Sequence, residues 1–203
     1  MAKRSAPEVN AGSMADIAFL LLIFFLVTTT IETNQGVSAK LPERQPPNQE
    51  APPIKEKNVF MVMVNEQDQL LVEEELMGIE DLREAAEDFL DNGGDGSCTY
   101  CQGVKDPASS DNPNKAVISL KNNRGTSYEM YVAVQNELQA AYNSLRERER
   151  KRLYPNEVEW REMWAQYNAA KTSDARKEAL EPKIKKLQEL FPQKLSEADT
   201  QRD

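Results

Sequence analysis

The sequence predicts an α+β protein with a single N-terminal transmembrane helix, a Pro-rich linker, a small external α+β domain and a helical C-terminal extension. Three observations predict this class: an apolar run near the N-terminus, a cluster of prolines after it, and then alternating strand and helix patterns. The expected segments are a tail at 1–12, a span at 13–32, a linker at 33–57, the domain at 58–154 and the extension at 155–203.

The apolar run has the length of a membrane span. From Met14 to Ile31 it holds roughly 18 residues, which at about 1.5 Å per residue reach about 27 Å, close to the hydrocarbon thickness of a bilayer. Lys3 and Arg4 precede the run, and Glu32 is the first charge after it. By the positive-inside rule, we expect a cytoplasmic N-terminus and an external C-terminal part.

A secretory signal peptide is the alternative for the same run. Lys3 and Arg4 would form its basic region, 17–27 its apolar region, and 37–39 its cleavage site. The cleavage site would lie well past the end of the apolar run, beyond Glu32. The membrane helix is therefore the preferred interpretation.

One carboxylate, Asp16, lies in this run, and the residues leave two roles open for it. Ser13 and Asp16 fit a capping box, in which both side chains bind free backbone N–H groups at a helix start. Alternatively, the helix begins further upstream and places Asp16 below the membrane surface, where a charge costs roughly 2.5 to 3.5 kcal/mol and is usually kept for proton or ion passage.

The linker and the domain follow in order. Five prolines between 36 and 53 predict an extended linker. Strand patterns occupy 58–64 and 69–73, a helical pattern runs over 76–90, a third strand follows at 116–120, and a second helix starts at Ser127. This order predicts a small α+β domain.

A long loop between the first helix and the third strand contains Cys98 and Cys101, the chain's two cysteines. In an oxidising compartment a disulfide that holds the loop is the preferred interpretation; free thiols, a redox-active pair and a zinc site shared by two chains are the alternatives. Four loop carboxylates lack the spacing of a standard calcium loop, so we interpret them as solvated charge: Asp91, Asp95, Asp106 and Asp111.

The segment after the domain is rich in charge and then in aromatic residues. The run R-E-R-E-R-K-R at 146–152 predicts a solvated helix face first and a partner site second. Beyond Pro155, two further amphipathic helices are expected. Trp160 and Trp164 lie four residues apart on the first of them, and packing onto the chain's own domain is the commoner use of such a pair.

Composition excludes several functions. The net charge of -9 and the pI near 4.8 argue against nucleic-acid binding, because no basic patch is present. No histidine occurs in the chain, which removes the commonest general base and metal ligand. We therefore expect no enzyme activity, no catalytic residues, no cofactor and no metal.

The N-terminal motif resembles the ExbD/TolR family of biopolymer transport proteins. Asn10, followed six positions later by Asp16 and a run rich in Leu, Ile and Phe, is similar to the family pattern N-x-T-P-x-x-D. Leu41 and Pro42 resemble its membrane-proximal L-P element. The sequence departs from the pattern at Gly12 and Ser13, where the family usually has Thr and Pro.

The resemblance implies an inner-membrane subunit with a periplasmic domain, working with an ExbB/TolQ-like multi-helix partner and driven by the proton motive force. Asp16 would be the proton carrier, and the chain a homodimer inside the partner ring. The output would be TonB-dependent outer-membrane transport through a TonB-like protein, or, as in TolR, envelope integrity through a Tol-Pal protein. Without proton chemistry, the chain would be a membrane-anchored binding or scaffold protein, and with a cleaved N-terminus a secreted thiol-disulfide protein.

Overall fold

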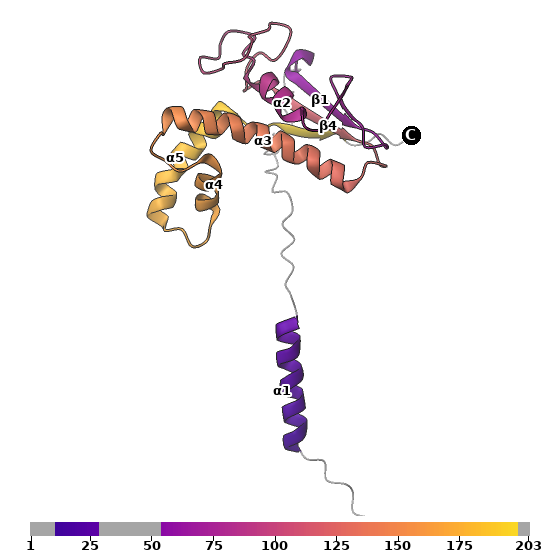
Figure 1. The fold of residues 1–203 in the computed structure, drawn as a ribbon. Coiled ribbons are helices and arrows are strands. Elements are labelled where there is room, and N and C mark those ends of the chain that lie inside the picture. The colour runs from indigo at the N-terminus through magenta and orange to yellow at the C-terminus, as the bar shows by residue number, and fades with distance from the viewer. Residues whose placement is uncertain (1–10, 29–53, 199–203) are drawn as a thin grey trace, which may run out of the picture. The chain divides into compact units, whose positions relative to one another are not determined.

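The computed structural model describes residues 11–28 and 54–198 and divides the chain into two compact units, 1–50 and 51–203 (Figure 1). The first unit contributes one described helix. The second contains a five-stranded sheet and all the remaining helices. The expected boundary between domain and extension at residue 155 does not separate two units, because both lie within the second.

The described part of the first unit is the helix α1, Ala11–Thr28, in which Asp16 is the one charged residue among mostly apolar ones. Its large side chains from Met14 to Phe25 are exposed, as expected for a helix whose apolar surface is covered by something other than its own unit. Within the described ranges, however, no helix combines the length and apolarity required to cross a membrane.

The sheet has the strand order β3-β2-β1-β4-β5. Its strands are β1 (Val59–Val64), β2 (Leu70–Val72), β3 (Glu75–Met77), β4 (Val117–Asn122) and β5 (Leu195–Ala198). The first three form an antiparallel meander, whereas β4 pairs parallel to β1 and β5 pairs parallel to β4. The predicted strands at 58–64, 69–73 and 116–120 thus correspond to β1, β2 and β4.

The predicted helix at 76–90 is wrong in its first residues. Leu71 pairs with Leu76 and Leu70 with Met77, so this segment begins as β3. The connection is a two-residue turn at Glu73 and Glu74, whose φ angles are 50° and 71°. Such a turn usually contains Asn or Gly, and the two glutamates therefore gave no turn signal in the sequence.

Two helices cover one face of the sheet. They are α2 (Leu82–Asp91) and the long α3 (Tyr128–Leu153), which pack against each other. Alternate residues of β1 (Phe60, Val62, Val64) are buried with apolar residues of both helices to form the main core. Ser127 caps α3, its side chain accepting a hydrogen bond from the backbone N–H of Met130 at 3.2 Å.

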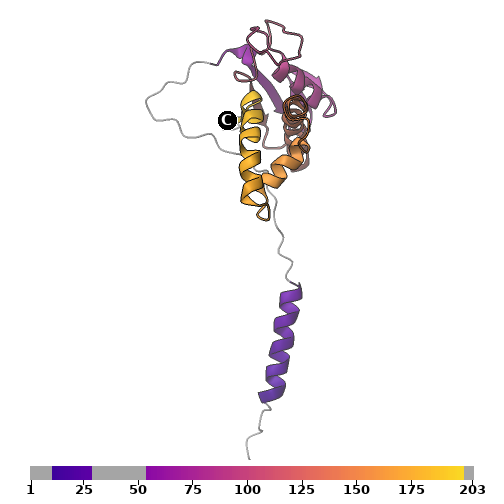
Figure 2. The ribbon, with the colours of Figure 1, turned by 90° about the vertical axis from the view of Figure 1, so that its left-hand side faces the viewer.

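The C-terminal part forms a helical hairpin and then returns to the sheet. Helices α4 (Trp160–Asn168) and α5 (Asp174–Leu190) lie side by side (Figure 2) and bury a second core of Trp160, Met163, Leu180, Ile184 and Leu187. The two expected helices are present. The extension is not helical throughout, however, because β5 follows them and completes the sheet beside β4.

The charged run at 146–152 is only partly solvated: Lys151 and Arg152 are exposed, but other residues of the run are not. Arg146, Glu149 and Arg150 are all buried. They continue the spacing of the apolar stripe of α3, where Leu138, Tyr142 and Leu145 are buried one and two turns earlier. The C-terminal hairpin packs on this end of α3. It covers charged side chains that the sequence pattern alone predicted to be exposed to solvent.

Candidate functional site

The N-terminal helix contains one ionisable group. Asp16 is the sixth residue of α1, and no other charged residue occurs between Ala11 and Thr28. Ser13 is itself helical, so it does not precede the helix as a capping residue must. The structure thus places the Asp16 carboxylate in the second turn of α1. A capping box would require it in the first turn, close to the free backbone N–H groups.

The surroundings of Asp16 on the helix are apolar. Phe19, Leu20 and Ile23 follow it at positions i+3, i+4 and i+7 and share its face. All three are exposed, as is Asp16. The arrangement is one carboxylate on an apolar surface with no cation in the same helix. The other motif residues, Asn10, Leu41 and Pro42, lie outside the described residues.

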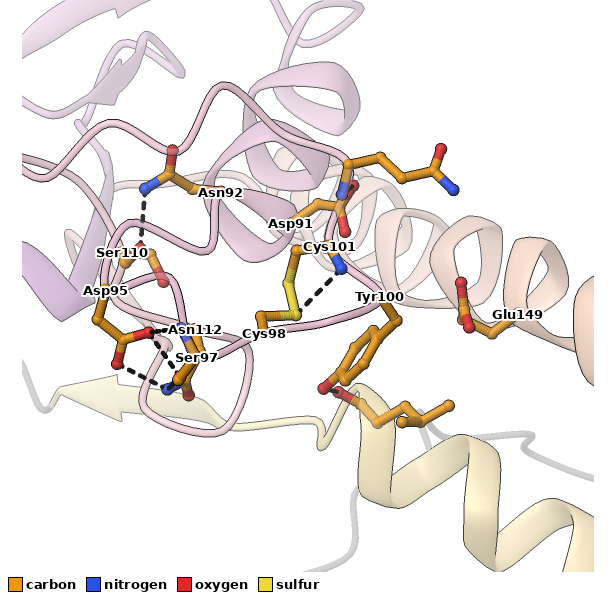
Figure 3. The surroundings of a disulfide bond; sticks show 12 residues. Asp91, Asn92, Asp95, Ser97, Cys98, Tyr100, Cys101, Ser110, Asn112 and Glu149 are labelled. Carbon is orange, nitrogen blue, oxygen red and sulfur yellow. Dashed lines mark hydrogen bonds between the residues drawn. A yellow bond between two sulfur atoms is a disulfide. The ribbon is translucent and has the colours of Figure 1, made fainter.

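The second candidate feature is the loop that joins α2 to β4. Cys98 and Cys101 form a disulfide with their Cα atoms 5.5 Å apart (Figure 3). Both side chains are buried, and the backbone N–H of Cys101 donates to the Sγ atom of Cys98 at 3.1 Å. A buried disulfide is typical of a structural cross-link, because thiol exchange requires an accessible sulfur.

The carboxylates of this loop are used in internal bonds. Asp91 accepts two hydrogen bonds from the Arg148 guanidinium, at 2.6 and 2.7 Å. Asp95 accepts from the backbone and hydroxyl of Ser97 and from Lys115, and these bonds lower its pKa. In the part of the chain that the structure describes, no cluster of three or more acidic or cysteine side chains is arranged to hold a metal.

Asp111 fastens the loop to the beginning of β1. Its carboxylate forms ion pairs with Lys57, with Lys55 at 3.4 Å and with Lys115 at 3.6 Å, although the side chain is almost fully buried. Asn58 donates to it as well, at 3.3 Å. The hydrogen bond from Lys57 is the largest of the effects that lower the pKa of Asp111 to about 2.

Arg146 is a buried contact that the sequence pattern did not indicate. Its Nε and Nη2 atoms both donate to the carbonyl of Phe191, at 3.1 and 2.7 Å, and its guanidinium lies near the rings of Tyr142 and Trp160. Burial lowers its pKa to about 10. The signal that could have revealed it is position: residue 146 lies four residues after the buried Tyr142.

The described chain thus combines an apolar helix that carries one carboxylate with a separate α+β domain. A model of the family described as biopolymer transport protein ExbD/TolR matches residues 2–147. The chain belongs to this ExbD/TolR family. A comparison with curated proteins gives no match.

The family match confirms the resemblance noted in the N-terminal motif, and it implies a role in energy-dependent biopolymer transport at the inner membrane. Proteins of this family generally work with ExbB/TolQ and TonB-like partners. The match includes α1, most of the sheet and most of α3, but it ends before α4, α5 and β5. The C-terminal hairpin therefore has no counterpart in the matched region.

Proposed function

We propose that this chain is the single-span subunit of an inner-membrane complex driven by the proton motive force, with Asp16 as its proton carrier. The complex would power TonB-dependent transport across the outer membrane. In this proposal α1 crosses the inner membrane, the N-terminus is cytoplasmic and the α+β domain is periplasmic.

One observation supports the role of Asp16 above all: the carboxylate lies in the second turn of a helix with no other ionisable residue. A charge in such a helix is costly in lipid and is usually retained for passage of protons or ions. No described helix alone meets the requirement for a span, but the apolar run continues in sequence to Ile31, outside the described residues.

The proposed mechanism alternates the charge of Asp16. The ionised carboxylate requires polar partners, whereas the protonated group tolerates an apolar wall. Gly12 lies one turn before Asp16, and a glycine at this position allows another helix to approach closely. A surrounding multi-helix partner could offer α1 both a polar position and an apolar position. Each change in the protonation of Asp16 would then change which position α1 prefers, and this difference would move α1 relative to the partner helices.

The partners follow from the same proposal. An ExbB/TolQ-like protein would surround a homodimer of this chain, and the periplasmic domain would contact a TonB-like or Tol-Pal protein. We also propose that the chain has no enzymatic activity, since it lacks histidine and its loop carboxylates are occupied by internal bonds. The proposal includes no cofactor, metal or nucleic acid.

The test compares Asp16→Asn with Asp16→Glu in cells. Each variant must first reach the membrane and co-purify with its multi-helix partner at the native level. We expect the amide to assemble but to lose the driven process, because it cannot carry a proton, and the glutamate to keep at least part of it. Loss of nutrient uptake would identify a TonB-type output, and loss of envelope integrity would identify a Tol-type output.

Ser13→Ala serves as the matched control. If Asp16 and Ser13 formed only a capping box, Ser13→Ala would cost about 0.5–2 kcal/mol of helix stability, whereas Asp16→Asn, whose amide oxygen can still accept the hydrogen bond, would cost a few tenths to about 1 kcal/mol and would keep the driven process. The proton-carrier proposal expects Ser13→Ala to function normally. An Asp16→Asn variant that assembles at the native level and is still active would contradict proton transfer by Asp16. The alternative of a membrane-anchored scaffold protein would then be favoured.

A further inference from the structure

The first half of β1 has a neighbouring strand on one side only. β4 pairs with β1 along its whole length, from Val59 to Val64, whereas β2 pairs with it only from Val62 to Val64. Glu73, the residue after β2, still contacts Met61: its backbone N–H donates to the Met61 carbonyl at 3.0 Å, and its carboxylate accepts from the Met61 N–H at 2.6 Å. In the described sheet, no strand lies on this side of β1 before Met61, so β1 begins with an open edge.

The carbonyl of Val59 lies on this open edge. Alternate residues of a strand direct their backbone groups to the same side, so the carbonyls of Val59 and Met61 both point away from β4. The Val59 N–H is already bound to the Glu56 carbonyl. The edge therefore offers one acceptor, the Val59 carbonyl, to an N–H group of an extended segment that lies beside it.

A pocket of about 420 Å³ opens beside this edge, between the start of β1, helix α2 and the loop that follows α2. Its apolar lining consists of Val59, Phe60, Ala85, Phe89 and Val104. The buried Phe60 and Phe89 rings pack against each other with their centroids 5.0 Å apart. Val104 is apolar and yet 91% exposed. The pocket thus has the size and the lining to take an apolar side chain.

The charged residues that line the pocket are mainly acidic. Three of them are exposed carboxylates: Glu73, Asp88 and Asp106. Among the described residues, no lysine or arginine forms an ion pair with any of the three. Lys57 also lines the pocket, but its ammonium is bound to the Asp111 carboxylate and to the Pro107 carbonyl. The pocket therefore carries uncompensated negative charge, which favours a cationic ligand.

We propose that this pocket and the open edge of β1 bind a basic, extended segment of another protein. The segment lies along the first half of β1 and donates a backbone N–H to the Val59 carbonyl. One apolar side chain enters the pocket, and the side chains two positions before and after it point to the same side of the segment. Lysine or arginine at these two positions pairs with the pocket carboxylates, so the recognised pattern is basic-x-apolar-x-basic. This proposal does not depend on proton transfer by Asp16.

Binding of synthetic peptides to the full chain in non-ionic detergent tests the proposal. The probe is the peptide T-K-T-V-T-K-T with blocked ends and a fluorescent label, and its binding is measured by fluorescence anisotropy. The peptide T-T-K-V-K-T-T has the same composition and charge, but it places both lysines on the side of an extended chain opposite to the valine. We expect the first peptide to bind at least about fivefold more tightly than the second.

Two substitutions in the pocket test its lining. Ala85→Leu fills the space for the apolar side chain, so the T-K-T-V-T-K-T peptide should bind at least about tenfold more weakly. Asp88→Asn removes one charge and should weaken binding about 1.5- to 5-fold. Glu84→Gln is the control and should leave binding unchanged, because Glu84 is exposed one turn earlier on α2 and does not line the pocket. Each variant must keep the circular dichroism spectrum of the native chain.

Methylation of single peptide amides tests the backbone contact. Alternate N–H groups of an extended segment point to the same side, so N-methylation of the central valine and N-methylation of the threonine after it remove donors on opposite sides. We expect one of these two peptides to bind about 2- to 10-fold more weakly than the unmodified peptide, and the other to bind nearly as tightly.

Three results would overturn the proposal. Equal binding of the two lysine arrangements would reveal attraction by net charge alone, since the chain carries a net charge of -9. Native binding by both Ala85→Leu and Asp88→Asn, with both variants folded, would place the peptide elsewhere on the domain. Equal binding of the two N-methylated peptides would exclude a bond to the Val59 carbonyl. The assay contains no proton gradient, so its failure would not bear on the role of Asp16.

Discussion

At the scale of single residues, the most informative positions are charged side chains in buried surroundings. Arg146, Glu149 and Asp111 are each buried, although their types favour the surface. Each has a specific partner: a backbone carbonyl, an arginine or a group of lysines. Residue type alone could not predict the positions of Arg146 and Asp111, since the Phe191 carbonyl and the lysines before β1 are distant in sequence. The partner of Glu149 is local, but its burial depends on the packing of the C-terminal hairpin on α3.

Arg146→Ala should destabilise the C-terminal half strongly. The change leaves the Phe191 carbonyl without its two donors and opens a gap between the Tyr142 and Trp160 rings. We expect a loss of about 2–4 kcal/mol in the free energy of unfolding. Urea unfolding followed by tryptophan fluorescence suits the test, because both tryptophans of the chain lie in α4.

Lys151→Ala is the control for this prediction. Lys151 belongs to the same charged run, but its side chain is 69% exposed. Its removal should change the free energy of unfolding by no more than about 0.5 kcal/mol. Equal effects of the two substitutions would contradict the structural role given to Arg146.

Asp111 should make the attachment of its loop sensitive to acid. Its pKa is about 2 in the folded protein against 3.8 for an ordinary aspartate, so the unfolded chain binds the proton more readily. The stabilisation is therefore complete above about pH 4 and is lost as the pH falls through about 2.

Urea midpoints at pH 5, 3 and 2 for the native chain and Asp111→Asn measure this dependence. The stability difference between the two proteins should be largest at pH 5 and should shrink toward pH 2. A difference that stays constant over this range would show that the ionised carboxylate does not hold the loop to β1.

At the scale of elements, the sequence predicted those with strong local patterns. β1, with its dense β-branched and apolar residues, and α3, with its long stripe, are where the periodicity placed them. β3 and β5 were missed. β3 depends on a turn of two glutamates, and the short L-S-E-A segment of β5 becomes a strand only through parallel pairing with β4.

Glu74→Gly should stabilise the β2–β3 turn. Glu74 has a φ of 71°, a left-handed conformation that disfavours residues with a Cβ atom, and its side chain is exposed. We expect a gain of about 0.5–1 kcal/mol in the free energy of unfolding, partly offset by the greater freedom of glycine in the unfolded chain.

Glu75→Gly, one residue further, is its control. Glu75 is exposed and extended in β3, so glycine there removes no strain and should destabilise by about 0.5–1 kcal/mol. Thermal unfolding of the two variants separates these effects by the sign of the change in Tm. A lower Tm for Glu74→Gly would show that the turn is not strained.

At the scale of the whole molecule, the division into an N-terminal helix and a separate α+β domain could be predicted from composition. The apolar run, the prolines and the later alternation each mark one part. The return of the chain to the sheet after α5 could not, because it depends on contacts of Arg146, Tyr100 and Phe191 between distant segments. The family match supports a general role in biopolymer transport. Proton transfer through Asp16 is our proposal for what the N-terminal helix contributes to that role.

The most direct measurement is an infrared titration of the full chain assembled with its multi-helix partner, comparing the native protein with Asp16→Asn. The account predicts a protonated-carboxyl band that appears and disappears with pH in the native complex and is absent from the variant. A native complex whose carboxyl band does not differ from that of the variant at any pH at which the driven process operates would contradict proton transfer by Asp16.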